Sequence, residues 1–426
     1  MPTLLLDLGP LAHLSGGEGP LTGQQMKDDD SLVETEGKGI LIDGGHIQRI
    51  SDSDEMRAEY VGGKRGFGLV GEEIEGLNVI EVGGRAVIPG LVDSHTHLLW
   101  GGDRSREMRW RQQGESYQSI AKMGGGIVHT VQQTRSMRLE DLISTGLARI
   151  DVALANGTTA MEVKSGYGLS TDSELRLLEA ASQLQGVSID STWLGAHASP
   201  PDIERETYVE QILSEQLPAV IDSGQARSAD VFCEPGWFTL EETEDICRAA
   251  MEGGLDIRLH VDEFVDGGGL SLAAELGALS GDHAHWSDSQ ARAEASAAGT
   301  LQCFLPGTPF SMGETHFPPA SECVEFEYPW CAATDFNPNC QILSLPFIGN
   351  LLSQRMGVDP LASLVAVSRN SGYVTKHEMG LKHGMVVEGG AADLNILDSP
   401  FWESWCQRPG ISPFAATMKG GDLMLH

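Results

Sequence analysis

Two histidines separated by one residue, His95 and His97, are the first side chains whose type and spacing suggest chemistry. They lie in the apolar run LVDSHTHLLW. Because alternate residues of a strand face the same side, both imidazoles can reach one ion if this run is a strand. A pattern this short also occurs among packed or exposed histidines. Its meaning therefore depends on the residues that the fold brings next to it.

Further imidazoles and carboxylates occur in four other short apolar runs. They are His197, His260 with Asp262 and Glu263, Asp282 with His283 and His285, and Asp335. All lie near the carboxyl ends of expected strands, which is the edge where parallel β/α barrels build active sites. Burial of so many polar groups is costly unless they pair or bind a metal. We therefore interpret the set as a metal-centred active site.

Four of these residues, His95, His97, His260 and Asp335, offer three nitrogens and one carboxylate oxygen. Such a set suits Zn²⁺ or iron and leaves a position for water. A metal ion lowers the pKa of that water toward neutrality and so provides a nucleophile. We expect Asp335 to take the proton of the water and to pass it to a leaving nitrogen.

Glu263 and His283 are the other catalytic candidates. Glu263 can hydrogen-bond a ring nitrogen or help to activate water, and His283 can hydrogen-bond the water or a carbonyl oxygen. The alternative is that both residues only support the metal ligands. A serine nucleophile is less suitable, because Ser165, between Lys164 and Tyr167, lacks the G-x-S-x-G elbow.

The elements that position these residues are expected in residues 88–384, where short apolar runs alternate with helical patterns. The eight runs are LVDSHTHLLW, TTAMEVK, IDSTWLGAHA, ADVFCE, LDIRLHVDE, ALSGDHAHW, TLQCFLP and WCAATDF. The helical patterns include LEDLISTGLARIDVALA and TDSELRLLEAASQL, whose apolar residues recur at helical spacing. Eight strands joined by helices predict a closed (β/α)8 TIM barrel.

The two ends of the chain have a different texture. Residues 1–87 contain short strands with glycine turns, and residues 385–426 return to the same style in GMVVEGGAADLNILD and GDLMLH. We expect residues 1–87 and 385–426 to form one composite β-sandwich domain beside the barrel. Within it, the polar, glycine-rich residues 16–39 are expected to form a surface loop.

Composition limits the partners and the compartment. The 61 acidic and 28 basic residues give a net charge of −33, which repels nucleic acid and anionic lipid. The seven cysteines form no C-x-x-C pair, and no run approaches the ~18 apolar residues of a membrane span. We expect a cytoplasmic protein that acts on a small molecule, without nucleic acid or membrane partners, and that forms a homodimer.

Longer blocks of the sequence resemble a known family. VIPGLVDSHTHL resembles the first-strand signature of the amidohydrolase superfamily. One family of this superfamily, the imidazolonepropionases, is matched more closely. Its pattern resembles two further blocks of this chain, GGDRSREMRWRQQGESYQSIAKMGGGI and EVKSGYGLS. LGAHA, VFCEPGWFT, HVDEF, DHAHW, LPGTPF and ATDFNPN continue that pattern in order, and AADLNILD resembles the family's terminal strand. The resemblance covers the barrel nearly end to end and extends into both β flanks.

The resemblance implies roles for individual residues. It implies one Zn²⁺ or Fe²⁺/Fe³⁺ per chain, bound by His95, His97, His260 and Asp335. Some amidohydrolases bridge two metals with a carboxylated lysine, but the family counterpart of Lys164 is not such a ligand. It further implies substrate contacts at Arg104, Tyr167, His197, Glu263, Asn337, Asn339 and Cys340.

The residues themselves allow a further interpretation of four of these contacts. Arg104 is a forked cation that suits a substrate carboxylate, and the alternative is a structural ion pair. Tyr167 lies in the glycine-flanked loop S-G-Y-G, where its hydroxyl can reach the substrate, and the alternative is a packed tyrosine. After D-x-N-P the family generally has small residues, whereas this chain has Asn339 and Cys340. A side chain bulkier than glycine there puts the loop contacts in doubt.

The implied activity is hydrolysis of the ring amide of 4-imidazolone-5-propanoate to N-formimino-L-glutamate, a step of histidine degradation. A related cyclic amidohydrolase or aminohydrolase that acts on a nucleobase-like ring is the alternative within the enzyme class, and it would not need Arg104 to meet a propionate. A catalytically silent barrel kept for binding or assembly is the alternative outside that class. The intact set of ligands argues against a silent barrel.

Overall fold

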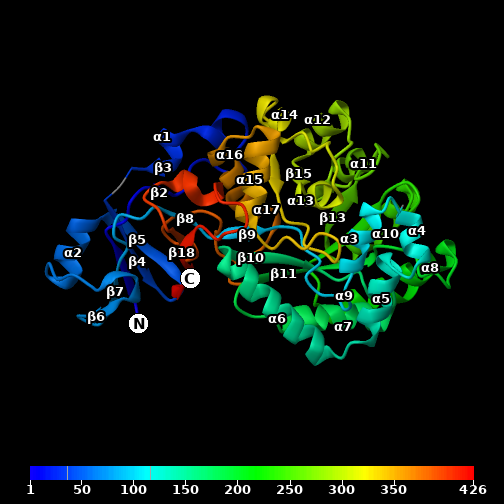
Figure 1. The fold of residues 1–426 in the computed structure, drawn as a ribbon, viewed down its shortest axis with the longest axis horizontal. Helices are drawn as coiled ribbons and strands as arrows, with labels where there is room; N and C mark the ends of the chain where they lie inside the picture. The colour runs from blue at the N-terminus through cyan, green and yellow to red at the C-terminus, as the bar shows by residue number, and fades with distance from the viewer. Residues whose placement is uncertain (36, 116) are drawn as a thin grey trace.

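The computed structural model describes residues 1–35, 37–115 and 117–426, so position 116, within the family-like block at 101–127, lies outside the described residues. Figure 1 shows two parts side by side. Strands from both ends of the chain lie on the left, and a helix-covered barrel lies on the right. The fold expected from the sequence, a (β/α)8 barrel with a small β domain built from both ends, is confirmed.

Eight parallel strands form the barrel, each hydrogen-bonded to the next in chain order. They are β9 (Leu91–Asp93), β10 (Thr158–Lys164), β11 (Ser188–Ala196), β12 (Ser228–Cys233), β13 (Asp256–Val261), β14 (Ser280–His283), β15 (Leu301–Phe304) and β16 (Trp330–Ala332). Each of the eight expected runs overlaps one of them, and six of the runs contain the whole strand. Most of their residues are buried on both faces, which is why parallel barrel strands read as continuous apolar runs.

The first strand is shorter than expected. β9 ends at Asp93, so His95 and His97 lie in an extended segment beyond it rather than within a strand. That segment closes the barrel against the chain that follows β16. The Asp335 amide donates to the His95 carbonyl at 3.1 Å, and the His97 amide donates to the Phe336 carbonyl at 2.8 Å. Both candidate histidines and the candidate aspartate therefore lie on this closing seam.

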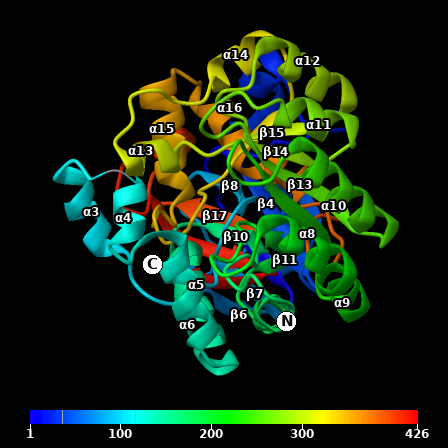
Figure 2. The ribbon, with the colours of Figure 1, turned by 90° about the vertical axis from the view of Figure 1, so that its right-hand side faces the viewer.

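Helices surround the strands, as Figure 2 shows for α6, α10, α11, α12 and α15. The helices between the strands are α3 (Ser105–Gln112), α4 (Tyr117–Lys122), α5 (Gly126–Ser136), α6 (Leu139–Ala155), α7 (Thr171–Ser182), α8 (Arg205–Gln211), α9 (Leu217–Ser223), α10 (Leu240–Glu252), α11 (Gly269–Glu275), α12 (Ser289–Ala298), α13 (Gly307–Met312) and α14 (Ala320–Glu325). After β16 come α15 (Leu345–Met356), α16 (Pro360–Val365) and α17 (Ser371–Val374). Short π-helices interrupt this framework at Ile212–Gln216 and Ala366–Asn370.

Helix α6 illustrates why these segments are helical. Its buried residues Leu142, Gly146, Ile150 and Ala153 recur every three or four positions and pack on the barrel. Both α6 and α7 begin at the residue expected from the sequence. None of the described helices is both long and apolar enough to span a membrane.

The two chain ends meet in a pair of sheets. One has the order β5-β4-β1-β7-β6 and the other the order β19-β18-β17-β8-β2-β3. Their bounds are β1 (Thr3–Leu6), β2 (Leu11–Ala12), β3 (Val33–Glu34), β4 (Lys38–Asp43), β5 (His46–Asp52), β6 (Glu72–Ile74), β7 (Leu77–Glu81), β8 (Val87–Pro89), β17 (Leu394–Leu397), β18 (Phe414–Lys419) and β19 (Asp422–Leu425), with helix α2 (Ser53–Val61) beside the first sheet. Leu5, Ile42 and Ile80 of the first sheet share one apolar cluster with Leu394 and Ile396 of the second. Strand β17 pairs with β8, which joins the two ends.

Residues 16–39 do not form the expected surface loop. They contain a 3₁₀ helix (Gly23–Lys27), helix α1 (Asp29–Leu32) and strand β3. Leu21, Met26 and Leu32 are buried in the same cluster as the barrel helices, and the Leu21 amide donates to the Asn370 side chain at 2.9 Å. Three well-spaced apolar residues are enough to anchor a segment whose composition is otherwise polar.

Candidate active site

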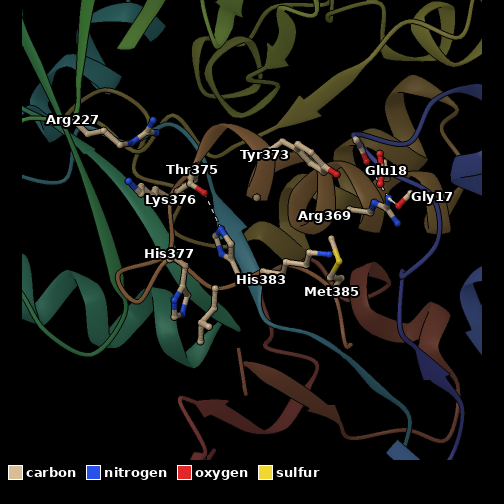
Figure 3. Close-up of a pocket in the computed structure, with 15 residues that line it drawn as sticks. Gly17, Glu18, Arg227, Arg369, Tyr373, Thr375, Lys376, His377, His383 and Met385 are labelled. Carbon is tan, nitrogen blue, oxygen red and sulfur yellow. Dashed lines mark hydrogen bonds between the residues drawn. The ribbon is translucent and has the colours of Figure 1, made fainter. Parts of the chain in front are cut away.

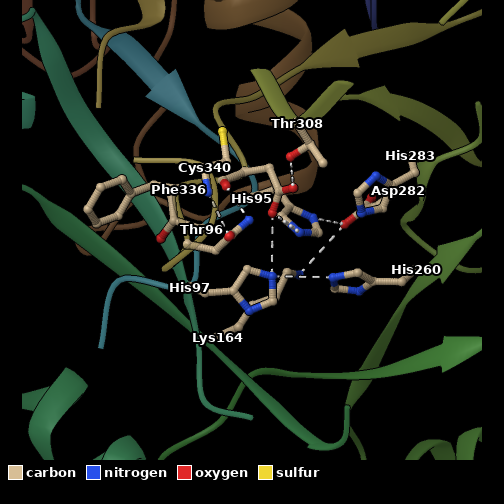
Figure 4. Close-up of polar contacts among 12 residues, drawn as sticks. His95, Thr96, His97, Lys164, His260, Asp282, His283, Thr308, Phe336 and Cys340 are labelled. Atoms are coloured by element: carbon tan, nitrogen blue, oxygen red, sulfur yellow. Dashed lines mark hydrogen bonds and ion pairs between the residues drawn. The ribbon is translucent and has the colours of Figure 1, made fainter. Parts of the chain in front are cut away.

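The four expected ligands converge at the carboxyl ends of the barrel strands (Figure 4). His95 Nε2 and His97 Nε2 each lie 3.5 Å from Asp335 Oδ1. His97 Nε2 lies 3.3 Å from His260 Nε2. All four side chains are buried. Three imidazole nitrogens and a carboxylate oxygen therefore point at one small volume.

Carboxylates behind two of the histidines fix which ring nitrogen faces that volume. Asp282 Oδ2 lies 2.6 Å from His95 Nδ1, and Asp230 Oδ2 lies 2.8 Å from His260 Nδ1. A proton on Nδ1 leaves the Nε2 lone pair directed at the centre. Burial lowers the pKa of His95 well below its ordinary value, which favours the neutral ring. His95 Nε2 is also a buried atom without a hydrogen-bond partner in the described residues. These features fit a divalent metal ion.

Lys164, at the end of β10, is a buried cation beneath the ligands. Its Nζ lies 2.8 Å from Glu162 Oε1, 2.8 Å from Asp230 Oδ2 and 3.6 Å from Asp282 Oδ2. Burial lowers the pKa of Lys164, but the Asp230 and Glu162 carboxylates outweigh this and raise it above its ordinary value. One ammonium group thus compensates three buried carboxylates, two of which hold ligand histidines.

Several residues at the strand ends have an unusual backbone. Asp262, His283, Ala284 and Asp335 have φ angles of 50°, 67°, 44° and 51°, in the left-handed region that non-glycine residues rarely adopt. Such conformations persist where the surroundings hold them in place. For Asp335 these surroundings include the Thr308 hydroxyl, which donates to Oδ2, and the seam hydrogen bond of its amide.

A cavity of about 430 Å³ opens above this centre. Its lining includes ten of the expected substrate-binding, catalytic and ligand residues: His97, Arg104, Tyr167, His197, His260, Glu263, His283, Asp335, Asn337 and Asn339. The volume is at the small end of ligand pockets. It suits a single-ring substrate.

Cys340 lies apart from this lining. Its side chain is fully buried, with Sγ 3.7 Å from the Thr334 carbonyl, and its amide donates to Asn337 Oδ1 at 2.9 Å. The Asn339 amide donates to the same oxygen at 2.8 Å, and its side chain contacts Arg111 and Met312. Cys340 therefore shapes the loop around Asn337 rather than facing the cavity.

Arg104 reaches the cavity as part of an ion pair. Its Nε and Nη2 each donate to a carboxylate oxygen of Glu107 at 2.8 Å. Glu107 Oε1 also accepts from the Gly126 amide at 2.8 Å. The structural ion pair considered from the sequence is present, and it orients a guanidinium that still lines the cavity.

Buried carboxylates hold two loops of the site. Glu234 accepts from the amides of Glu263, Phe264 and Val265 at 2.9, 3.1 and 3.0 Å. Its position fixes the backbone that carries Glu263.

Glu174 has the same function in the S-G-Y-G loop. It accepts from the amides of Gly166, Gly168 and Leu169 at 2.7 Å each. His197 Nδ1 donates to the Gly166 carbonyl at 3.0 Å. The Tyr167 and His197 rings lie 5.1 Å apart, so both are placed at the same wall of the cavity.

Glu263 and His283 form a second pair near the centre, with Glu263 Oε2 3.6 Å from His283 Nε2. Burial and the nearby Asp335 carboxylate raise the pKa of Glu263 well above its usual range. Burial lowers the pKa of His283 well below its ordinary value. Burial thus favours the protonated form of the Glu263 carboxyl group and the neutral form of the His283 imidazole beside it.

Sequence reasoning missed two groups of site residues. One is an apolar and aromatic wall formed by Phe232, Trp237, Phe264, Pro309 and Met312. The other is the set of supporting groups Glu162, Asp230 and Thr308. VFCEPGWFT and LPGTPF contain members of both groups, and a polar residue within an otherwise apolar strand was the available signal for Glu162 and Asp230.

Comparisons with known proteins identify relatives along the whole chain. An imidazolonepropionase from Symbiobacterium thermophilum is 36% identical over 99% of this chain and 97% of its own length. One from Haloarcula marismortui is 35% identical over 96% of this chain and 94% of its own length. No protein-family model matches the chain.

Solved structures with similar folds have much lower sequence identity. A triazine hydrolase variant has a TM-score of 0.71 and 15% identity, covering 100% of this chain and 94% of its own. A 5-methylcytosine deaminase from Klebsiella pneumoniae has a TM-score of 0.67 and 16% identity, covering 100% and 97%. At this identity the similarity concerns the fold.

Proposed function

Because this chain belongs to the imidazolonepropionase family, we propose that it hydrolyses the ring amide of 4-imidazolone-5-propanoate to give N-formimino-L-glutamate. The observation that carries the proposal is the convergence of His95, His97, His260 and Asp335 at the floor of a cavity that Arg104 also lines. A nucleobase-type ring has less support, because the relatives that suggest one are similar in fold alone.

We propose that His95, His97, His260 and Asp335 hold one Zn²⁺ or iron ion per chain. When bound, such an ion acts as a Lewis acid and lowers the pKa of a water molecule toward neutrality. Neutral imidazoles and a buried carboxylate are suitable ligands because they present lone pairs without competing protons.

The reaction adds water to the ring carbonyl carbon, breaks the adjacent C–N bond and gives the leaving nitrogen a proton. Asp335 receives the proton of the water at its carboxylate and passes it to that nitrogen. His283, which lines the cavity, is the proposed hydrogen-bond partner of the carbonyl oxygen, and a protonated Glu263 would donate a hydrogen bond from its O–H to the other ring nitrogen. The Thr308 hydroxyl keeps the Asp335 carboxylate in place.

We propose that the other residues that line the cavity position the substrate. Arg104 meets the propionate carboxylate through its oriented guanidinium. Tyr167 and His197 contact the ring from one wall, and Asn337, whose Oδ1 organises the amides of Asn339 and Cys340, closes another. The aromatic wall supplies the apolar surface that a small planar ring needs.

The decisive experiment combines metal analysis with an assay of ring opening on imidazolone propionate. We expect about one Zn²⁺ or iron per chain and loss of turnover on chelation. Asp335→Asn keeps an oxygen ligand but removes the proton carrier, so kcat should fall by at least ~10²-fold with metal still bound. Asp222→Asn, at an exposed position of α9, is the matched control.

Two tightly bound ions per chain would contradict the proposed ligand set, and full turnover by metal-loaded Asp335→Asn would contradict the role of Asp335. If kcat/KM on a ring analogue without the carboxylate equalled kcat/KM on imidazolone propionate, the nucleobase-type alternative would be favoured.

A further inference from the structure

A second cavity, of about 580 Å³, lies at the opposite end of the barrel from the active site (Figure 3). Arg227, in its lining, directly precedes β12, whose carboxyl end faces the active site. The remaining lining comes from residues 17–19, from residues 369–377 after the last barrel strand, and from residues 380–385. It therefore lies where the chain passes between the barrel and the terminal sheets.

The lining of this cavity is basic although the protein is strongly acidic. Four of its residues are Arg227, Arg369, Lys376 and Lys382, and Glu18 is its acidic member. The whole chain has 28 basic residues against 61 acidic ones. A local excess of positive charge in a field of the opposite sign marks a place where a small anion is held by specific contacts rather than by the overall field.

Arg227 is already neutralised. Its guanidinium donates to both carboxylate oxygens of Asp190, to Asp256 at 2.6 Å and to the Val374 carbonyl at 2.8 Å. It forms a rigid floor and contributes little net charge to the recess.

Arg369 has no such compensation. Its side chain is buried, and it donates to the backbone carbonyls of Leu14, Gly19 and Gly17 at 2.7, 3.0 and 3.3 Å. Within the described part of the chain no carboxylate lies within ion-pair distance of it, and its Nε has no hydrogen-bond partner. A buried cation without a counter-charge is costly, and an anion beside it reduces that cost.

Other groups in the recess are also available to a ligand. Lys376 and Lys382 are exposed, and neither makes an ion pair with a described residue. His383 is 5% exposed; its Nε2 donates to the Thr375 carbonyl at 2.8 Å, and its Nδ1 has no partner in the described residues. The buried Thr375 hydroxyl likewise lacks one. Figure 3 shows His383 beside Thr375, with a dashed line for the hydrogen bond between them.

From these contacts we infer that the cavity is a binding site for a small metabolite bearing at least two oxyanion groups, carboxylate or phosphate. Lys376, Lys382 and Arg369 supply the charge, and the Thr375 hydroxyl supplies a directional hydrogen bond. His383 Nδ1, which carries no proton while Nε2 donates to Thr375, can accept a hydrogen bond from a hydroxyl of the ligand. The volume exceeds what a single chloride ion needs. This site is distinct from the catalytic cavity and does not depend on the proposed function.

Calorimetric titration of the metal-loaded full chain tests the inference, with glutarate and inorganic pyrophosphate as separate probes at constant ionic strength. We expect saturable binding of one molecule per chain by at least one probe. Which probe binds identifies carboxylate or phosphate as the recognised group. The double variant Lys376→Ala/Lys382→Ala should weaken binding at least tenfold and leave turnover without the probe unchanged.

Two controls locate the binding. Lys64→Ala/Arg65→Ala removes the same number of charges from an exposed part of the terminal domain and should leave the affinity unchanged. Arg104→Met alters the active site and should also leave it unchanged. Absence of saturable binding by both probes, an equal loss in the Lys64/Arg65 variant, or a loss confined to Arg104→Met would overturn the inference. None of these results depends on which substrate the enzyme hydrolyses.

Discussion

Arg104 is held in a structural ion pair, and we propose that the same side chain recognises the substrate. Its bidentate pairing with Glu107 fixes the guanidinium before any substrate arrives, so little side-chain entropy is lost on binding. The same pairing reduces the net charge that the cavity presents. Specificity for an anionic substrate then depends on the geometry of the remaining N–H groups rather than on a bare charge.

Replacement of Arg104 by Met should lower kcat/KM for imidazolone propionate. The lost transition-state stabilisation should be roughly 1.5–3 kcal/mol, because a charge-assisted hydrogen bond to the carboxylate is lost. Metal content should not change. Steady-state kinetics on this substrate and on a ring analogue without the carboxylate provide the measurement. On the analogue, Arg104→Met and the unmodified enzyme should have similar kcat/KM values.

Arg106→Met, at the exposed neighbour on α3, is the control. Arg104→Met/Glu107→Gln separates loss of recognition from the effect of an unpaired Glu107. If Arg104→Met slows both substrates equally, the residue is a scaffold.

We propose a different role for Lys164, because among the described residues its partners at charge-pairing distance are the carboxylates of Glu162, Asp230 and Asp282. Lys164→Met leaves Asp230 and Asp282 without their cation, so they hold the ligand histidines less firmly. We expect metal affinity to fall by ~10–100-fold, the range typical for residues that support ligands. Competition with a chelator measures this directly.

Lys122→Met, at the exposed last residue of α4, serves as the comparison. In Lys164→Met the buried carboxylates have lost the lysine beside them, which can also destabilise the fold. Lys164→Met/Asp230→Asn, which removes one of these carboxylates as well, is therefore measured in parallel. Folded Lys164→Met with unaltered metal affinity would rule out the positioning role.

At the scale of elements, the loop after β13 depends on one carboxylate from the loop after β12. Glu234→Gln replaces an acceptor with an N–H group that faces the loop amides, so at least one buried amide loses its partner. We expect a loss of roughly 1–3 kcal/mol in the free energy of opening this loop. Hydrogen exchange of the Glu263, Phe264 and Val265 amides reports it, and kcat should fall along with the protection.

Glu252→Gln, at an exposed position near the end of α10, is the matched control. Unchanged exchange rates in Glu234→Gln would show that the backbone of the loop is held by its other contacts.

The sequence predicted elements better than it predicted their contacts. Barrel strands were recognisable because two-sided burial requires continuous apolar runs, and β10 spans the expected TTAMEVK. Strand β9 is shorter than its apolar run, because beyond Asp93 the chain pairs with the segment after β16. Residues 16–39 were misjudged because composition does not reveal how few buried side chains suffice to anchor a segment.

In the candidate site, too, local features could be predicted from the sequence and contacts between segments could not. His95 and His97 were found because their spacing is local, and Asp335 because it ends an expected strand. Other features depend on how separate loops meet, which no periodicity in the sequence indicates. They are the loop contacts of Glu234 and Glu174 and the position of Cys340. The roles assigned to these residues remain predictions that the variants above test.

On the scale of the whole molecule, the net charge of −33 is the main unfavourable electrostatic contribution to compactness. Asp29 illustrates it locally, because burial and then the carboxylates of Asp359 and Glu403 raise its pKa above the ordinary value. Salt shortens the Debye length from ~10 Å at 0.1 M to ~3 Å at 1 M and so screens this repulsion.

We therefore expect the urea midpoint of unfolding to rise between about 0.1 M and 1 M NaCl, because screening favours the compact state. Circular dichroism measures the midpoint. Asp29→Asn should raise the midpoint at low salt and reduce its salt dependence, whereas Asp222→Asn, away from this cluster, should change both less. A midpoint that falls with salt would show that specific ion pairs outweigh the overall repulsion.

The closing seam of the barrel has a consequence for the order of assembly. Ligands on either side of that seam come from the segments after the first and the last barrel strands, so a bound ion cross-links the two ends of the barrel region. A cross-link over so long a loop removes much of the entropy of the open chain. During synthesis the emerging polypeptide cannot complete the four-ligand set until the eighth strand has left the ribosome. If the proposed ligands bind an ion, metal capture would require a full-length barrel, and truncated products would lack the complete site.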